Sequence, residues 1–77
     1  PEKTEEFLLA LAEALELESS ALTSTTNFSE IDWDSLAVIS AIALIDEHFG
    51  VMVPGQAISE CMGIPDLLSL INSYLPD

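Results

Sequence analysis

The chain has 77 residues, of which 49% are hydrophobic, and a formal net charge of −13. This length allows one domain, expected to span residues 1–77, with too small a core for a large enclosed active site. The charge excludes nucleic-acid binding through clustered basic residues and disfavours anionic membrane surfaces, because Lys3 is the single Lys or Arg in the sequence. Basic protein surfaces are the expected partners. The hydrophobic content is enough for a folded core, and we expect a monomer.

Cysteine content and hydropathy indicate where the protein is located and which metal sites it can form. Cys61 is the single cysteine, which excludes an internal disulfide framework and a multi-cysteine metal site. The longest apolar stretch, residues 36–45, is too short to span a membrane. No signal peptide is evident. We therefore expect a cytoplasmic protein without a membrane partner.

The first predicted helix spans residues 4–17, with Thr4 as its N-cap. Apolar side chains fall on one arc at about 100° per residue and glutamates on the opposite arc. This pattern predicts an amphipathic helix with a solvated acidic face. The apolar set is Phe7, Leu8, Leu11 and Leu15, and the acidic set is Glu5, Glu6, Glu13 and Glu16.

Residues 18–32 lose this periodicity and are rich in Ser, Thr and Asn. They predict a long ordered loop, pinned to the domain by the isolated apolar residues Phe28 and Ile31. Loops of this length inside a compact domain tend to be functional.

The second predicted helix begins at Asp34 or Ser35 and ends at Phe49. Asp34 suits the N-cap, and Gly50 can end the helix in a left-handed conformation. Such an apolar helix is central to the bundle, carries an exposed contact strip, or does both. Its two apolar stripes are Val38, Ile42, Ile45 and Phe49, and beside them Leu36, Ile39 and Ala43.

The C-terminal part predicts an extended segment and two more helices. Residues 51–53 are expected to be extended and to face the core, and residues 56–62 to form one or two helical turns that Gly63 ends. Pro65 suits the first turn of a last helix, which runs to about Leu75, where Pro76 ends it. Its expected inner face is Leu67, Leu70, Ile71 and Tyr74. The predicted fold is all-α, with three main helices, one short helix and a long first loop.

The sequence Asp-Trp-Asp-Ser-Leu at residues 32–36 lies where the long loop becomes the apolar helix. The unpaired N–H groups and the dipole at a helix N-terminus favour a phosphate there. The Ser35 hydroxyl would be accessible to a modifying enzyme at this position. The structural interpretation is that Asp34 and Ser35 only cap the helix.

Over essentially its whole length the chain resembles the acyl carrier protein family. The resemblance rests on Asp34-Ser35-Leu36, on residues 46–50 and 51–54, and on residues 63–68 at the start of the last helix. It implies a four-helix bundle in which Ser35 is esterified to 4′-phosphopantetheine. The group would come from coenzyme A, transferred by a separate Mg²⁺-dependent phosphopantetheinyl transferase. The carrier catalyses nothing and presents acyl thioesters to partner enzymes.

The resemblance also implies roles for neighbouring residues. Asp34 would assist the transferase at the metal site of that enzyme, and Leu36 would touch partners; the carrier itself holds no metal. Trp33 is expected to pack the loop onto the bundle, with contact to the arm as the alternative. Partners would be acyl-transferring or acyl-activating enzymes with basic or apolar docking surfaces. The expected contact residues are Leu36, Ile39, Ala43, Asp46 and Glu47.

The chain departs from carriers of fatty-acid synthesis, which have acidic residues two and five positions after the modified serine. Here those positions are Ala37 and Ser40, and Glu60 is the one acid near the short third helix. Docking along the second helix is therefore expected to be more apolar. This favours a specialised fatty-acid, polyketide or other acyl pathway over a housekeeping role. The small residues Ala37 and Ala41 are interpreted as allowing close helix packing rather than space for an acyl chain.

Other chemistries fit the sequence poorly. A serine hydrolase needs a base beside its serine, but His48 lies thirteen residues after Ser35, about 20 Å along the helix, and is expected to be solvated or to face a partner. A calcium loop starting at Asp32 would lack its glycine and its final glutamate, and zinc would lack ligands. Cys61 is expected to be a small core residue rather than a nucleophile.

Two alternatives stay open from the sequence. An aminoacyl or D-alanyl carrier would share the fold and the modified serine. An acidic helical interaction module without a prosthetic group would use Ser35 as a capping residue only.

Overall fold

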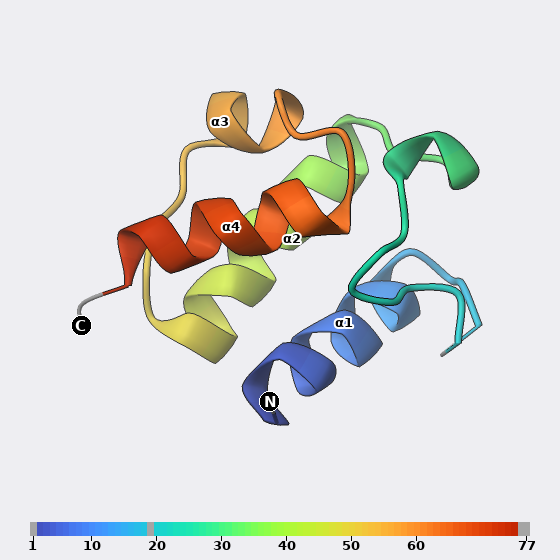
Figure 1. Ribbon diagram of the computed structural model, residues 1–77, viewed down its shortest axis with the longest axis horizontal. Coiled ribbons are helices and arrows are strands. Elements are labelled where there is room, and N and C mark those ends of the chain that lie inside the picture. The colour runs from blue at the N-terminus through green and yellow to red at the C-terminus, as the bar shows by residue number, and fades with distance from the viewer. Residues whose placement is uncertain (1, 19, 76–77) are drawn as a thin grey trace.

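The computed structural model describes residues 2–18 and 20–75 of the chain. Within them it has the helices α1 (Glu2–Ala14), α2 (Ser35–Phe49), α3 (Gly55–Ser59) and α4 (Ile64–Tyr74), with a 3-10 turn η1 (Phe28–Glu30) in the long loop (Figure 1). No strand forms in this part, so the predicted all-α fold is confirmed. None of its helices has the length and hydropathy needed to cross a membrane.

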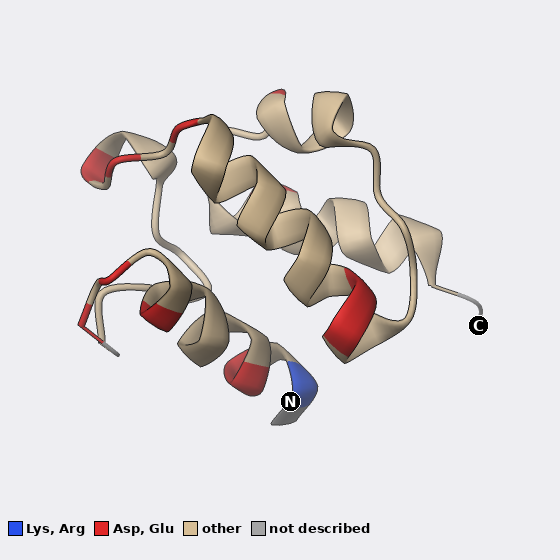
Figure 2. Ribbon diagram, turned by 180° about the vertical axis from the view of Figure 1, so that it is seen from behind, with Lys and Arg blue, Asp and Glu red and all other residues tan. Residues whose placement is uncertain are grey.

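The helix α2 is the central element, because both α1 and α3 pack against it. Seen from behind, acidic residues colour parts of α1, the loop and the C-terminal end of α2, whereas the rest of α2 carries none (Figure 2). The first three turns of α2 therefore carry no acidic side chain.

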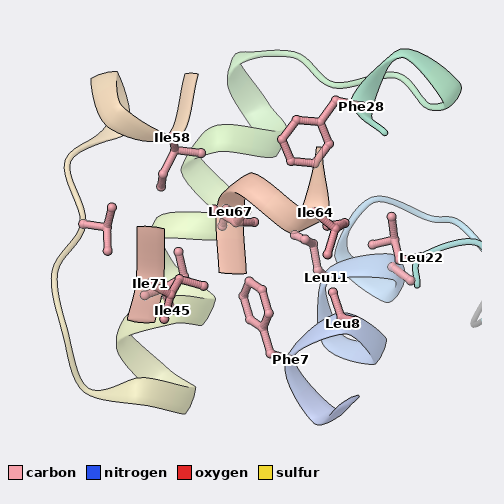
Figure 3. Packing of buried hydrophobic residues seen from close by; sticks show 13 residues of the cluster. Phe7, Leu8, Leu11, Leu22, Phe28, Ile45, Ile58, Ile64, Leu67 and Ile71 are labelled. Carbon is pink, nitrogen blue, oxygen red and sulfur yellow. The ribbon is translucent and has the colours of Figure 1, made fainter. Parts of the chain in front are cut away.

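The core collects side chains from every helix and from the long loop (Figure 3). The inner face of α1 contributes as predicted, and Phe7 meets the Phe49 ring edge-on at 5.5 Å between centroids. Leu15, also predicted on this face, is only half-buried. Burial of these apolar side chains is the main stabilising term for a domain of this size. The buried residues that Figure 3 labels are Phe7, Leu8, Leu11, Leu22, Phe28, Ile45, Ile58, Ile64, Leu67 and Ile71.

The predicted bounds of the first helix are wrong at both ends. The helix is already formed at Glu2, so Thr4 lies inside it and is not the N-cap. It ends at Ala14 rather than Leu17, because Glu16 adopts a left-handed conformation with φ of 60° and the Leu17 N–H donates back to the Ala12 carbonyl at 2.8 Å. This closure is the pattern of a Schellman motif, which ends a helix locally.

In its described residues the long loop is pinned by Phe28, as predicted, while Ile31 is half-buried. The loop is also tied to the segment before α4 by backbone hydrogen bonds, from the Phe28 N–H to the Met62 carbonyl at 2.9 Å and from the Ile64 N–H to the Thr26 carbonyl at 2.8 Å. A Cβ at Gly63 would lie 2.8 Å from the Thr26 carbonyl oxygen. Gly63 therefore permits a close backbone approach, besides separating two helices.

The second helix has the predicted bounds. Gly50 ends it with φ of 71° and donates its N–H to the Asp46 carbonyl at 2.9 Å. Ala37 and Ala41 are fully buried on the inner side, which agrees with the predicted close packing.

Several predictions for the C-terminal part are wrong in detail. Met52 is 68% exposed while Val53 is buried, because successive side chains of an extended segment point to opposite sides. The short helix ends at Ser59, and Tyr74 is 43% exposed at the end of α4, where its hydroxyl can stay in water. The last helix begins at Ile64, with Pro65 in its first turn as predicted. The expected role of Pro76 lies outside the described residues.

Candidate functional site

The site is built around the first turn of α2. The Asp34 backbone is extended, and its side-chain Oδ1 accepts a hydrogen bond from the Ala37 N–H at 3.0 Å. The Val38 N–H donates to the Asp34 carbonyl at 3.1 Å. Asp34 is thus the N-cap, as predicted, and Ser35 is the first helical residue.

Ser35 is exposed at this position. The first N–H groups of a helix have no partner within the helix, and the dipole adds partial positive charge there. A phosphoester on the Ser35 oxygen would therefore lie beside groups that stabilise its negative charge. An exposed hydroxyl that is not needed as the helix cap meets the requirements of an attachment point.

The structure gives Ser35 no histidine base. His48 lies at the opposite end of α2, where its ring meets Phe7 edge-on at 6.2 Å between centroids. It is half-buried, so the prediction of a solvated or partner-facing histidine is wrong in part, because the Phe7 ring covers one side. Catalysis by a serine–histidine pair is excluded by this separation.

Trp33 packs the end of the long loop onto the domain. Its indole stacks on the buried Phe28 ring, with centroids 3.8 Å apart and an interplanar angle of 4°. The prediction that Trp33 packs the loop is confirmed. Among the described residues its Nε1 is a buried donor without a hydrogen-bond acceptor.

A groove between α2 and α3, here called the α2–α3 groove, opens directly beside Ser35. It has a volume of about 490 Å³ and is mostly apolar. Gly55 lets the start of α3 approach α2, since a Cβ there would lie 3.3 Å from Ile42 Cδ1 and 3.5 Å from Val38 Cγ1. Its lining residues are Trp33, Asp34, Ser35, Val38, Ile39, Ile42, Gly55 and Ser59.

Sequence reasoning missed this groove. The sequence places Val38 and Ile42 on one apolar stripe of the second helix but does not indicate which element packs beside them. A glycine next to a short helix was the available signal, because such a glycine often marks a close approach between two elements.

The predicted contact residues lie together on the outward side of α2. Leu36 is 69% and Ile39 61% exposed. Ala43, Asp46 and Glu47 are exposed as well. Their spacing places them on one face of the helix, here called the α2 stripe, about 16 Å long. The stripe is apolar near Ser35 and acidic at its far end.

Cys61 lies at the edge of the core and is only half-buried, so it is less enclosed than predicted. Burial, and then the carboxylates of Asp66 and Glu60, raise the pKa of its thiol. A thiol with a raised pKa is a weak nucleophile near neutral pH. Across the described residues, no group of three or more His, Cys, Asp and Glu side chains could hold a metal ion.

Comparison with known proteins agrees with this geometry. A family model described as a phosphopantetheine attachment site matches residues 5–71. The chain is similar to an acyl carrier protein of Lactobacillus acidophilus, with 26% identity over 65 residues, covering 83% of this chain and 81% of that protein. No solved structure matches the chain significantly. The family match includes Ser35, the α2–α3 groove and the α2 stripe.

Proposed function

Because this chain belongs to the family of proteins with a phosphopantetheine attachment site, we propose that Ser35 is the residue that bears the group. Acyl carrier proteins of this family hold 4′-phosphopantetheine covalently and are not enzymes. They interact with a phosphopantetheinyl transferase and with acyl-handling enzymes. We also propose that residues 1–77 form one such domain, and that it acts as a monomer in the cytoplasm.

The observation that carries the proposal is the position of Ser35. Its hydroxyl is exposed at the first residue of α2, next to helix N–H groups that favour a phosphate. In the attachment step the Ser35 oxygen forms a bond to the phosphorus of the pantetheine phosphate. The phosphoanhydride bond of coenzyme A breaks, its nucleotide leaves, and the hydroxyl proton passes to a base of the transferase. One carboxylate oxygen of Asp34 accepts the Ala37 N–H. The other has no hydrogen bond within the described residues, and we assign it to the Mg²⁺ of the transferase.

The bound group supplies a thiol at the end of a flexible arm, which holds acyl groups as thioesters. The chain itself supplies a rigid attachment point, because Asp34 caps the helix and the Trp33–Phe28 stack fixes the loop before it. Tethering raises the effective concentration of the cargo near a docked partner enzyme.

We further propose that partners dock on the α2 stripe. Its apolar half, next to Ser35, would meet an apolar patch, and Asp46 and Glu47 would meet basic side chains at the far end. The stripe has no acid between Ser35 and Asp46. This supports a specialised pathway of fatty-acid, polyketide or other acyl synthesis, and an aminoacyl cargo remains the alternative.

The test is the intact mass of the protein after incubation with coenzyme A, Mg²⁺ and a promiscuous phosphopantetheinyl transferase. We expect the mass of one phosphopantetheine to be added to the wild type and to Ser69→Ala, which removes an exposed serine elsewhere. We expect no addition to Ser35→Ala. Addition to a folded Ser35→Ala variant would refute the assignment of Ser35.

The new thiol gives a second measurement in the same experiment. Because Cys61 is half-buried and its pKa is raised by burial, iodoacetamide near pH 7 should alkylate the accessible thiol of the arm before Cys61. A modified protein should therefore show one fast and one slow thiol, and the unmodified protein only the slow one.

A further inference from the structure

We propose that Trp33 is a positioning residue for the phosphopantetheine arm, whose indole holds the arm in the α2–α3 groove. The inference rests on the proposed function, since it needs a group on Ser35. It assigns to Trp33 a second role beyond packing of the loop.

The attachment point and the indole line the same groove. Ser35 contributes to its lining, and Trp33 contributes from two residues earlier in the chain. A group on the Ser35 oxygen therefore starts at the mouth of the groove. Because a short tether gives an effective concentration on the order of millimolar, even a weak contact between arm and groove would be populated.

The chemistry of the arm matches the walls of the groove. The first apolar part of phosphopantetheine after its phosphate is a carbon that bears two methyl groups. The groove offers the side chains of Val38, Ile39 and Ile42 along α2. Phe28 occupies one face of the indole, so the groove is left with the other face or the edge. The methyl groups can lie against this surface without any charge being buried.

The stack makes Trp33 a suitable fixed wall. An indole held parallel to Phe28 at 3.8 Å has little rotamer freedom left to lose when the arm contacts it. Its buried Nε1 also lacks an acceptor among the described residues, and such unpaired donors are uncommon in folded proteins. Because Nε1 is buried and the ring is held in the stack, the contact that we propose is apolar, between the methyl groups and the part of the ring that lines the groove.

The test is NMR spectroscopy of the modified protein, with modification confirmed by intact mass. Ring currents of the indole should move the two methyl signals of the arm from their positions in free pantetheine, upfield over the ring face or downfield at its edge, and cross-relaxation should connect these methyl protons to indole protons. Trp33 is the only tryptophan, so its indole N–H gives a single identifiable signal. We expect that signal to move on attachment of the arm.

Matched variants distinguish contact between the indole and the arm from the effects of a nearby substitution or of added negative charge. Trp33→Phe keeps an aromatic ring on Phe28 and should reduce this shift, and Trp33→Ala should abolish it. If Trp33→Ala does not fold, Trp33→Phe decides alone. Asp32→Asn changes the neighbouring residue, which lies outside the groove lining, and should leave the methyl signals as in the wild type. Ser35→Glu places negative charge at the attachment point without an arm and should not reproduce the movement of the indole N–H signal.

The outcomes separate the two proposals. Methyl signals at the positions of free pantetheine in a correctly modified wild type, or signals that Trp33→Phe leaves unmoved, would overturn the role of Trp33 and leave the attachment intact. A wild-type mass without phosphopantetheine would overturn the attachment to Ser35, and the inference about Trp33 with it.

Discussion

The helices α1 and α2 both bury one side in the core, but their outward faces differ. The outward face of α1 is mainly acidic, with Glu5, Glu6 and Glu13 exposed. The outward face of α2 carries Leu36 and Ile39, which are 69% and 61% exposed. The same domain thus has one helix that follows the usual amphipathic pattern and one that does not.

The difference indicates what each face is for. Carboxylates on α1 are well solvated and contribute charge that repels acidic proteins and attracts basic ones. Two large apolar side chains about one turn apart, directly after Ser35, remain in contact with water, which is unfavourable for apolar surface. A partner surface that covers them would gain the hydrophobic contribution that the fold leaves unused, about 25 cal/mol for each Å² removed from water.

The largest expected effect is on stability, and it should differ between the buried and the exposed side of α2. Ile45→Ala removes a fully buried side chain and should lower the free energy of unfolding by about 2–5 kcal/mol. Ile39→Ala removes the same atoms from the exposed stripe and should change it by less than about 0.5 kcal/mol, while slowing acyl transfer by a docking enzyme. Urea denaturation of both variants measures the contrast. Equal losses of stability would mean that the stripe is part of the fold and not a free surface.

The helix α2 also shows which features could be predicted from the sequence alone. The bounds of α2 were predictable because Asp34 and Gly50 act through local backbone geometry, which residue type largely determines. The exposed position of Ser35 followed from those bounds. The α2–α3 groove was not predictable, since it depends on the approach of Gly55 to Ile42, two residues from different elements.

The difference between local backbone geometry and packing between elements also explains the wrong predictions at helix ends. Thr4 has the chemistry of a cap, but Glu2 and Lys3 are good helix formers and precede it in the helix. Tyr74 has helical spacing with Ile71, yet at the end of α4 it is left partly in water. Periodicity predicts which side of a helix faces inward, but not how far along the helix the core extends.

A smaller effect is expected at the start of α2, where capping and chemistry are assigned to adjacent residues. Asp34→Ala removes the side-chain acceptor of the Ala37 N–H and should cost about 1 kcal/mol, which lowers the melting temperature by about 4–8 °C. Ser35→Ala should cost less, because Ser35 follows the cap, and yet it should abolish attachment. Thermal melts followed by circular dichroism measure both.

Asp34→Asn is the control for this pair. Asparagine caps helices about as well as aspartate, so stability should be retained while the carboxylate that we assign to the metal site of the transferase is lost. Attachment to Asp34→Asn should therefore be slower at unchanged melting temperature. Attachment at the wild-type rate would show that Asp34 serves the helix alone.

The smallest expected effect tests the acidic face of α1. The domain measures 31 × 26 × 19 Å, comparable to the Debye length of about 30 Å at 0.01 M salt and well above the length of about 8 Å at 0.15 M. At low salt each carboxylate therefore interacts with most of the net charge of −13, and at moderate salt only with its neighbours. The melting temperature should rise by a few degrees between these conditions.

A triple variant, Glu5→Gln, Glu6→Gln and Glu13→Gln, assigns that repulsion to α1. It removes three negative charges from exposed positions, so it should melt higher than the wild type at low salt and respond less to added salt. The exposed apolar residues of α2 are unchanged in it, and their contribution does not depend on ionic strength in this range. An unchanged melting temperature in the wild type at both salt concentrations would mean that charge repulsion does not limit stability. The acidic face of α1 would then matter for the choice of partner rather than for the fold.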